Sequence, residues 1–372
     1  MDDQKYHEPT DATLNRLNAD YYDVMSSSKR FSLQSLFNSD AIRLDEFCKE
    51  FSPHPQGEEL KEQVESYSKS NGVWLSNATH HLSCALFLYP GAEPQRMLTM
   101  MKNLTIDFYL NDVMGRDTFK FLTIEEQASA TEMIQRMSNM NASLYADREA
   151  PILEIANAEV LREFKESSPE GWFRNFLRLY CHHIDITHRD VHAQYDDGSI
   201  VSVPDYLMDR CHLGGVHHII TWLEYSNGQF LNQDELRAAR LGQRLRRLHW
   251  LMAAFAGSSN DFFSFEKEVV DNRSDSNLIA VMALNNPSLN LSEIIVRASG
   301  IVRNLLAEII LLTTYIKKEL EKIERLYPDL SGKLKVQLGG ALRWVQATWL
   351  WQVYTKRYKR QDSIWSETAL LA

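Results

Sequence analysis

The sequence predicts an all-α fold dominated by long helices, and two observations support this. The chain of 372 residues contains only 15 glycines and 10 prolines, so it offers few breaks for turns between short strands. Apolar side chains recur at helical spacing over residues 94–108, 291–326 and 334–354. Because 44% of the residues are hydrophobic, the chain can also bury a sizeable core.

Charge and cysteine content exclude several classes of protein. The net charge of −10 argues against nucleic acid as a partner. The four cysteines are widely spaced without a Cys-x-x-Cys pair, which fits free thiols in a reducing cytosol. No apolar run approaches the ~18–20 residues that cross a bilayer, and the first residues lack the apolar segment of a secretory signal. We therefore expect a cytoplasmic protein without stable membrane insertion.

The chain divides into a tail and one domain. Residues 1–30 are polar and acid-rich, and we predict a mobile N-terminal tail there, with room for a short helix around residues 14–25. Residues 31–372 are predicted to form a single helical domain. Its first half should contain helices over residues 74–89, 94–108, 124–139, 151–165 and 172–184.

An acidic cluster follows the helix predicted over residues 94–108. The sequence Asn-Asp-Val-Met-Gly-Arg-Asp occupies residues 111–117 and supplies the oxygen-bearing side chains Asn111, Asp112 and Asp117. Taken alone, this cluster equally fits a helix that ends near Gly115 with solvated acids.

Residues 204–224 contain an arginine followed by a potential helix break. The guanidinium of Arg210 suits bidentate contact with phosphate. Four residues later, Gly214 would let the helix break and turn a carbonyl group toward a cavity. An ordinary surface arginine before a helix kink would give the same pattern.

The most informative stretch is Asn-Asp-Phe-Phe-Ser-Phe-Glu-Lys-Glu over residues 260–268. Asn260, Ser264 and Glu268 stand four residues apart, so a helix places them on one face. An amide oxygen, a hydroxyl and a carboxylate are hard ligands of the kind Mg²⁺ prefers. Spacing alone also allows a polar stripe on a solvated helix.

The whole nine-residue string resembles the second metal-binding motif of class I terpene synthases, which is Asn-Asp-x-x-Ser-x-x-x-Glu with a lysine before the glutamate. All of its positions are filled here, including Asp261 and Lys267. The cluster at residues 111–117 resembles the aspartate-rich motif of the same family. It departs from that motif because Asn111 replaces the first acid and Gly115 stands in the place of the last.

The resemblance implies an all-α class I terpenoid synthase fold, with about a dozen helices around an apolar active-site cavity, of the microbial single-domain type. It also implies a cluster of about three Mg²⁺ ions and, as is common in the family, a homodimer. The implied metal ligands are Asp112, Asn260, Ser264 and Glu268, with Asn111 and Asp117 as weaker candidates. The diphosphate contacts would be Arg210, Lys267 and an Arg-Tyr pair near the C-terminus, Arg357 and Tyr358, with Gly214 at the helix break. Phe108, Phe87 and Trp349 are candidates for the cavity wall.

The function implied is Mg²⁺-dependent ionisation and cyclisation of a linear prenyl diphosphate, farnesyl or geranylgeranyl diphosphate. The products would be inorganic diphosphate and a cyclic terpene hydrocarbon or alcohol. One alternative is a helical binding protein on the same fold with impaired catalysis, since Asn111 and Gly115 depart from the motif. Another is a prenyl diphosphate synthase, although that family uses an aspartate-rich second motif.

The substitution Asn111→Asp tests whether the first motif still binds metal. We expect equal or higher turnover with Mg²⁺, because a carboxylate is a stronger ligand for this ion than an amide oxygen. Product formed per enzyme in a steady-state assay measures the effect. Complete loss of turnover would instead assign Asn111 a specific role as an amide.

Overall fold

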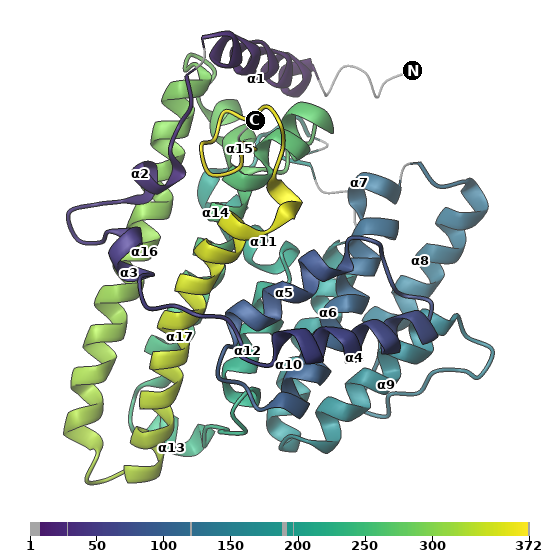
Figure 1. The fold of residues 1–372 in the computed structure, drawn as a ribbon, viewed down its shortest axis with the longest axis vertical. Coiled ribbons are helices and arrows are strands. Elements are labelled where there is room, and N and C mark those ends of the chain that lie inside the picture. The colour runs from purple at the N-terminus through teal and green to yellow at the C-terminus, as the bar shows by residue number, and fades with distance from the viewer. Residues whose placement is uncertain (1–7, 28, 120, 188–191, 196, 371–372) are drawn as a thin grey trace.

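The computed structural model describes residues 8–27, 29–119, 121–187, 192–195 and 197–370, and within them it contains helices and no β-strand (Figure 1). This confirms the all-α prediction. The helices are α1 (Glu8–Ser26), α2 (Leu33–Phe37), α3 (Leu44–Phe47), α4 (Gly57–Ser70), α5 (Ala78–Leu88), α6 (Pro94–Met114), α7 (Arg116–Phe119), α8 (Ile124–Ser138), α9 (Ile152–Glu166), α10 (Glu170–Thr187), α11 (Val203–Leu213), α12 (Val216–Tyr225), α13 (Gln233–Ala238), α14 (Gly242–Phe265), the π-helix η1 (Glu266–Asp271), α15 (Leu278–Asn285), α16 (Leu291–Ile323), α17 (Pro328–Tyr354) and the 3₁₀-helix η2 (Lys356–Tyr358).

Helix α14 occupies the centre of the bundle and packs against α11, α12, α15, α16 and α17. Its middle is apolar on every side, because the consecutive residues Leu251, Met252, Ala253, Ala254 and Phe255 are all buried. A helix that is hydrophobic all round belongs inside a protein, where neighbouring helices cover each face. The polar residues at the C-terminal end of α14 are therefore carried into the interior by an apolar stem.

Helix α6 packs against α4, α5 and α9 on the other side of the molecule. Pro94 occupies its first turn, as predicted, since proline needs no hydrogen-bond partner there. The helix extends to Met114, beyond the expected end at residue 108. Asn111 and Asp112 consequently stand on its last helical turn, as expected of a helix that ends near Gly115.

The N-terminal segment differs from the predicted mobile tail. Glu8–Ser26 forms helix α1, which packs against α15, α16 and η1. Leu14, Leu17 and Tyr21 are buried, and they lie three and four residues apart on one face. The composition of the segment is mostly polar because the apolar stripe is narrow. The stripe nevertheless packs the helix against the domain. Residues 1–7 lie outside the described part of the chain.

Glu266, at the start of η1, joins both ends of the chain to this π-helix. Its carboxylate accepts hydrogen bonds from the Tyr21 hydroxyl at 3.1 Å, from the Ser363 hydroxyl at 2.7 Å and from the Ile364 backbone N–H at 2.9 Å. Glu266 is only 2% exposed, so water cannot replace these donors. The segment that carries Glu268 is thereby held between α1 and the C-terminal residues.

None of the described helices is both long enough and apolar enough to cross a membrane.

Replacing Glu266 by alanine tests this attachment. We expect Glu266→Ala to lower the free energy of unfolding by roughly 3 kcal/mol, because three buried donors lose their acceptor. Glu266→Gln is the matched control, since its amide oxygen can still accept from Tyr21 and Ile364 while its NH₂ group can donate to Ser363. Denaturant unfolding measures both variants, and equal stability of alanine and glutamine variants would contradict the account.

Candidate active site

A cavity of about 600 Å³ lies between the half of the bundle that contains α6 and the half that contains α14. Helices α5, α6, α10, α11, α12, α14, η1 and α17 all contribute side chains to its wall. Part of this wall is apolar and is formed by Leu88, Leu104, Phe108, Ile219, Trp344 and Trp351. The remainder contains the polar residues that the sequence singled out, so one cavity brings the separate motifs together.

The second motif lies where α14 passes into η1. Asn260 and Glu268 line the cavity, whereas Ser264 is 2% exposed and donates its hydroxyl to the Asn260 carbonyl oxygen at 2.9 Å. The sequence predicted one continuous α-helix through all three residues. The structure has a π-helix from Glu266 onward instead, a feature that often occurs at functional sites. Glu268 therefore presents its carboxylate from a widened turn.

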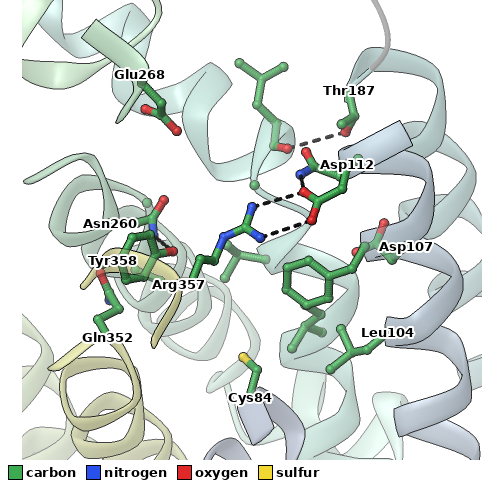
Figure 2. A pocket seen from close by; sticks show the side chains of 18 of the residues that line it. Cys84, Leu104, Asp107, Asp112, Thr187, Asn260, Glu268, Gln352, Arg357 and Tyr358 are labelled. Atoms are coloured by element: carbon green, nitrogen blue, oxygen red, sulfur yellow. Dashed lines mark hydrogen bonds and ion pairs between the residues drawn. The ribbon is translucent and has the colours of Figure 1, made fainter. Parts of the chain in front are cut away.

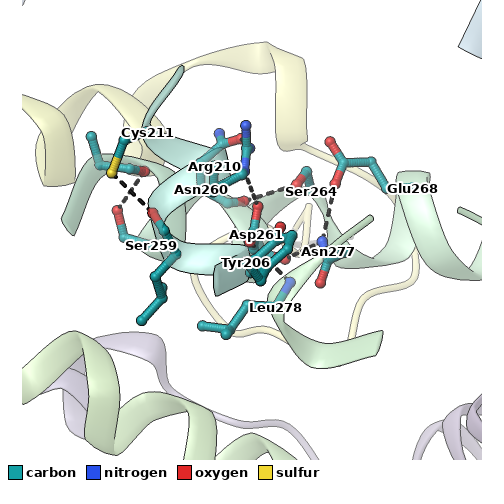
Figure 3. A network of polar contacts seen from close by, with 12 residues as sticks. Tyr206, Arg210, Cys211, Ser259, Asn260, Asp261, Ser264, Glu268, Asn277 and Leu278 are labelled. Carbon is teal, nitrogen blue, oxygen red and sulfur yellow. Dashed lines mark hydrogen bonds and ion pairs between the residues drawn. The ribbon is translucent and has the colours of Figure 1, made fainter. Parts of the chain in front are cut away.

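Arg210 is fixed by a buried carboxylate, that of Asp261 (Figure 3). The Arg210 Nε donates to Asp261 Oδ1 at 2.8 Å, and a terminal guanidinium nitrogen donates to Asn260 Oδ1 at 3.0 Å. The Tyr206 hydroxyl donates to Asp261 Oδ2 at 2.6 Å. Asp261 is fully buried, so its charge is balanced by Arg210 rather than by water.

Asn277, just before α15, braces the same segment. Its side-chain nitrogen donates to Glu268 Oε2 at 3.0 Å and to the Asp261 carbonyl oxygen at 2.9 Å, while its side-chain oxygen caps α15. The backbone N–H of Leu278 also donates to the Asp261 carboxylate. Asn277 is not among the residues that the sequence singled out, although a cap residue directly before an apolar helix was a signal available there.

The predicted helix break follows Arg210 directly. Gly214 ends α11, and Gly215 has a φ of +66°, in the left-handed region that glycine adopts most readily. The close approach of α11 to α14 requires a third glycine, because a Cβ on Gly257 would lie 2.9 Å from Arg210 Cγ. The break thus falls at the predicted place, although Gly215 rather than Gly214 carries the unusual backbone angle.

Asp112, on α6, lines the cavity opposite Asn260 and Glu268, and hydrogen-bond donors surround its carboxylate. His81 Nε2 lies 3.1 Å from one carboxylate oxygen, the Arg357 guanidinium lies 3.3 Å from the other, and Asn111 donates to the carboxylate at 2.9 Å. Burial raises the pKa of Asp112, but the bond from His81 and the charge of Arg357 outweigh it and hold the pKa well below its usual range. The carboxylate is therefore ionised.

The C-terminal Arg-Tyr pair connects the two sides of the cavity. Arg357 binds Asp112 and lies over the Phe108 ring, with 5.6 Å between the guanidinium carbon and the ring centroid. Tyr358 accepts a hydrogen bond from the Asn260 side chain at 2.6 Å. Figure 2 shows Arg357 between Asp112 on one side and Asn260, Tyr358 and Glu268 on the other. The Arg-Tyr pair thus contacts residues of both motifs.

The motif residues still to be placed are Lys267, Gly115 and Asp117. Lys267 is exposed and lines the cavity. A Cβ at Gly115 would clash with the Asn111 carbonyl oxygen, so this backbone leaves no room for the missing third acid of the motif. The side chain of Asp117 lies outside the described residues.

Two of the three predicted wall residues do not line this cavity. Phe108 lines the cavity, but Phe87 stacks on Phe51, and Trp349 packs against Phe37 and Phe263 in the core. On α17 the wall is formed instead by Trp344, Thr348, Trp351 and Gln352, which share one face of the helix. Trp349 lies on another face of α17. Because both faces contain tryptophan, the sequence alone does not indicate which face lines the cavity.

A comparison with known protein families identifies the same segments that line the cavity. A family model described as terpene synthase family 2, C-terminal metal binding, matches residues 102–308, more than half of the chain. This match includes both motif segments and the helix break. A search of curated proteins found no match.

Solved structures share the fold at low sequence identity. An α-eudesmol synthase is 18% identical with a TM-score of 0.62, and the match covers 82% of this chain and 96% of that one. A wild-type cucumene synthase is 15% identical with a TM-score of 0.65, covering 81% and 97%. A linalool/nerolidol synthase from Streptomyces clavuligerus, in complex with 2-fluorogeranyl diphosphate, is 12% identical with a TM-score of 0.65, covering 81% and 100%. Because the family model spans most of the helical core and these structures share its fold, the chain belongs to the class I terpene synthases.

Proposed function

We propose that this protein ionises farnesyl or geranylgeranyl diphosphate in a Mg²⁺-dependent step and cyclises the resulting cation to a terpene hydrocarbon or alcohol. The observation that supports the proposal is that oxygen-bearing side chains line opposite sides of one cavity, Asp112 on α6 and Asn260 with Glu268 on α14 and η1. A volume of about 600 Å³ lies within the range of small-molecule sites.

The donor set fits hard divalent cations. Asp112 is held ionised, as a metal ligand must be, and Asn260 and Glu268 add an amide oxygen and a second carboxylate. Ser264 is the fourth candidate, and its hydroxyl lies beneath Asn260. When bound, Mg²⁺ would supply Lewis-acid neutralisation of the departing diphosphate.

Cationic side chains would bind the diphosphate from both sides. Arg210 is oriented toward the cavity by Asp261, and Arg357 approaches it from the C-terminal segment. A guanidinium held by a carboxylate offers its remaining N–H groups in a fixed direction, which favours developing negative charge on a phosphate oxygen. Lys267 and Tyr358 lie at the same rim.

The apolar wall would then direct the cation. The aromatic side chains of Trp344 and Trp351, which line the cavity, would stabilise positive charge without acting as nucleophiles. The apolar surroundings also keep water away until the rings have closed. The hydrogen bonds that hold Asn260 and Glu268 in place do not favour impaired catalysis. A prenyl diphosphate synthase is not favoured either, because Glu268 is the one acid among Asn260, Ser264 and Glu268.

The test is a paired incubation of the purified chain with and without Mg²⁺, offering geranyl, farnesyl, geranylgeranyl and geranylfarnesyl diphosphates separately. We expect a cyclic hydrocarbon or alcohol, identified by gas chromatography and mass spectrometry, only when Mg²⁺ is present. The variants Asn260→Ala and Glu268→Ala should lose turnover by about 10²-fold or more with an unchanged fold.

Glu308→Ala is the matched control, because it removes a carboxylate from an exposed ion pair with Arg247. Normal turnover by Glu268→Ala with a normal melting curve would remove Glu268 from the metal site. Absence of product from the folded wild-type chain with all four substrates would favour the binding protein with impaired catalysis.

A further inference from the structure

The cavity wall contains a charged pair that the metal and diphosphate sites do not use. Asp107 on α6 and His183 on α10 both line the cavity, and His183 Nε2 lies 2.8 Å from Asp107 Oδ1. Their side chains are 14% and 7% exposed. Burying charged groups costs desolvation free energy, and the apolar side chains around this pair do not offset that cost. The pair therefore calls for a functional explanation.

The His183 ring is held in one orientation. Its Nδ1 lies 3.2 Å from the His212 carbonyl oxygen and 2.8 Å from the Thr187 hydroxyl oxygen. Behind the ring, the site of a Cβ on Gly215 would be only 2.9 Å from His183 Nε2, so the helix break gives the imidazole its space. Helices α6, α10 and α11 therefore meet at this ring.

These contacts fit a doubly protonated imidazole ring. Nδ1 can donate to the His212 carbonyl oxygen, which only accepts, and Nε2 can donate to the Asp107 carboxylate. Burial lowers the pKa of His183, but the charge and hydrogen bond of Asp107 outweigh it and raise the pKa. The raised pKa of His183 and the 2.8 Å contact favour a carboxylate paired with an imidazolium.

The neighbouring histidine, His218, does not change the charge around Asp107 and His183. The ring of His218, on α12, lies 5.2 Å from that of His183 and is fully buried beside Tyr180 and Trp222. Burial lowers the pKa of His218 to about 3, so this ring is neutral at physiological pH. It adds no second positive charge next to the pair.

Asp107 is separated along α6 from Asp112, which it precedes by five residues, a rise of about 7.5 Å along the helix. It stands four residues before Asn111, the weaker candidate ligand, whose side chain donates to Asp112. At the level of Asp107, the cavity wall is contributed by Leu104 and Phe108 on either side of it in sequence. Figure 2 shows Asp107 on the same helix as Asp112 and next to Leu104, away from Asn260 and Glu268.

We propose that Asp107, paired with His183, is the proton acceptor that ends the cyclisation, so that the product is a hydrocarbon. This inference rests on the proposed function. A C–H bond next to the cationic carbon breaks, its electron pair forms a C=C bond, and the proton passes to the Asp107 carboxylate. The charge of the cation is discharged without any further reactant, and the proton leaves to water when the site opens.

The pairing suits this task. A C–H bond beside a carbocation is a very strong acid, so even a carboxylate weakened by an imidazolium can accept its proton. The same imidazolium lowers the nucleophilicity of the carboxylate, which disfavours capture of the cation as an ester. A neutral pair also costs the cation less repulsion than a lone imidazolium would.

The experiment compares Asp107→Asn with Asp107→Glu in the full chain, with Mg²⁺ and the substrate that the wild type turns over. Asparagine keeps the shape and removes the base, whereas glutamate keeps a carboxylate. Products are counted per diphosphate released, so a change in ionisation rate does not affect the result. We expect the hydrocarbon fraction to fall at least about tenfold in Asp107→Asn, with alcohol replacing it, and to recover largely in Asp107→Glu.

His183→Gln retains the carboxylate and should keep hydrocarbon as the major product, which provides a second test if Asp107→Asn does not fold. Asp234→Asn, in an exposed ion pair with Arg237, is the surface control. An unchanged hydrocarbon fraction in Asp107→Asn, or equal losses in the Asn and Glu variants, would overturn the proposal. Diphosphate release by the wild type with alcohol as the only product would also overturn it and leave the proposed function standing, whereas no release at all would contradict both.

Discussion

The architecture of the site depends on one buried ion pair, that between Asp261 and Arg210. Asp261 is fully buried on α14, and its carboxylate also accepts from Tyr206 on α11 and from the backbone at the start of α15. Three helices are thereby joined at one carboxylate. Breaking such a pair leaves an uncompensated charge in the interior, at a cost of about 3–5 kcal/mol.

The same carboxylate sets the direction of the functional groups. Arg210 is left with N–H groups that reach Asn260 and the cavity, and Asn277 links the Asp261 backbone to Glu268. A ligand set placed on the end of an apolar helix is rigid only if neighbouring elements hold that end. Here α11, α15 and the Glu266 attachment to both chain ends provide that support.

Much of this arrangement could be predicted from the sequence because it is local. The spacing of Asn260, Ser264 and Glu268 is a property of one helix, and the long amphipathic stretches identified most helices to within a few residues. The π-helix at Glu266 could not be predicted, since it depends on the buried donors that Glu266 meets from residues far away in sequence.

Contacts between distant segments were equally hidden. Asp107 and His183 are 76 residues apart, and nothing in either stretch shows that α6 and α10 bring them together. Trp349, the predicted wall residue on α17, lies outside the cavity for a related reason. Aromatic residues occupy more than one face of this helix, and only the position of the neighbouring helices decides which face meets the cavity.

The central claim is that Asp112 and the Asn260–Glu268 pair hold metal ions around a diphosphate within one cavity. A crystal structure with Mn²⁺ and inorganic diphosphate tests it directly, because the anomalous signal of Mn²⁺ locates each ion independently of the refined side chains. We expect manganese bound to Asp112 and to Asn260 with Glu268, and the diphosphate between them in contact with Arg210 and Arg357. Manganese bound elsewhere, or diphosphate bound without metal on either side, would contradict the account.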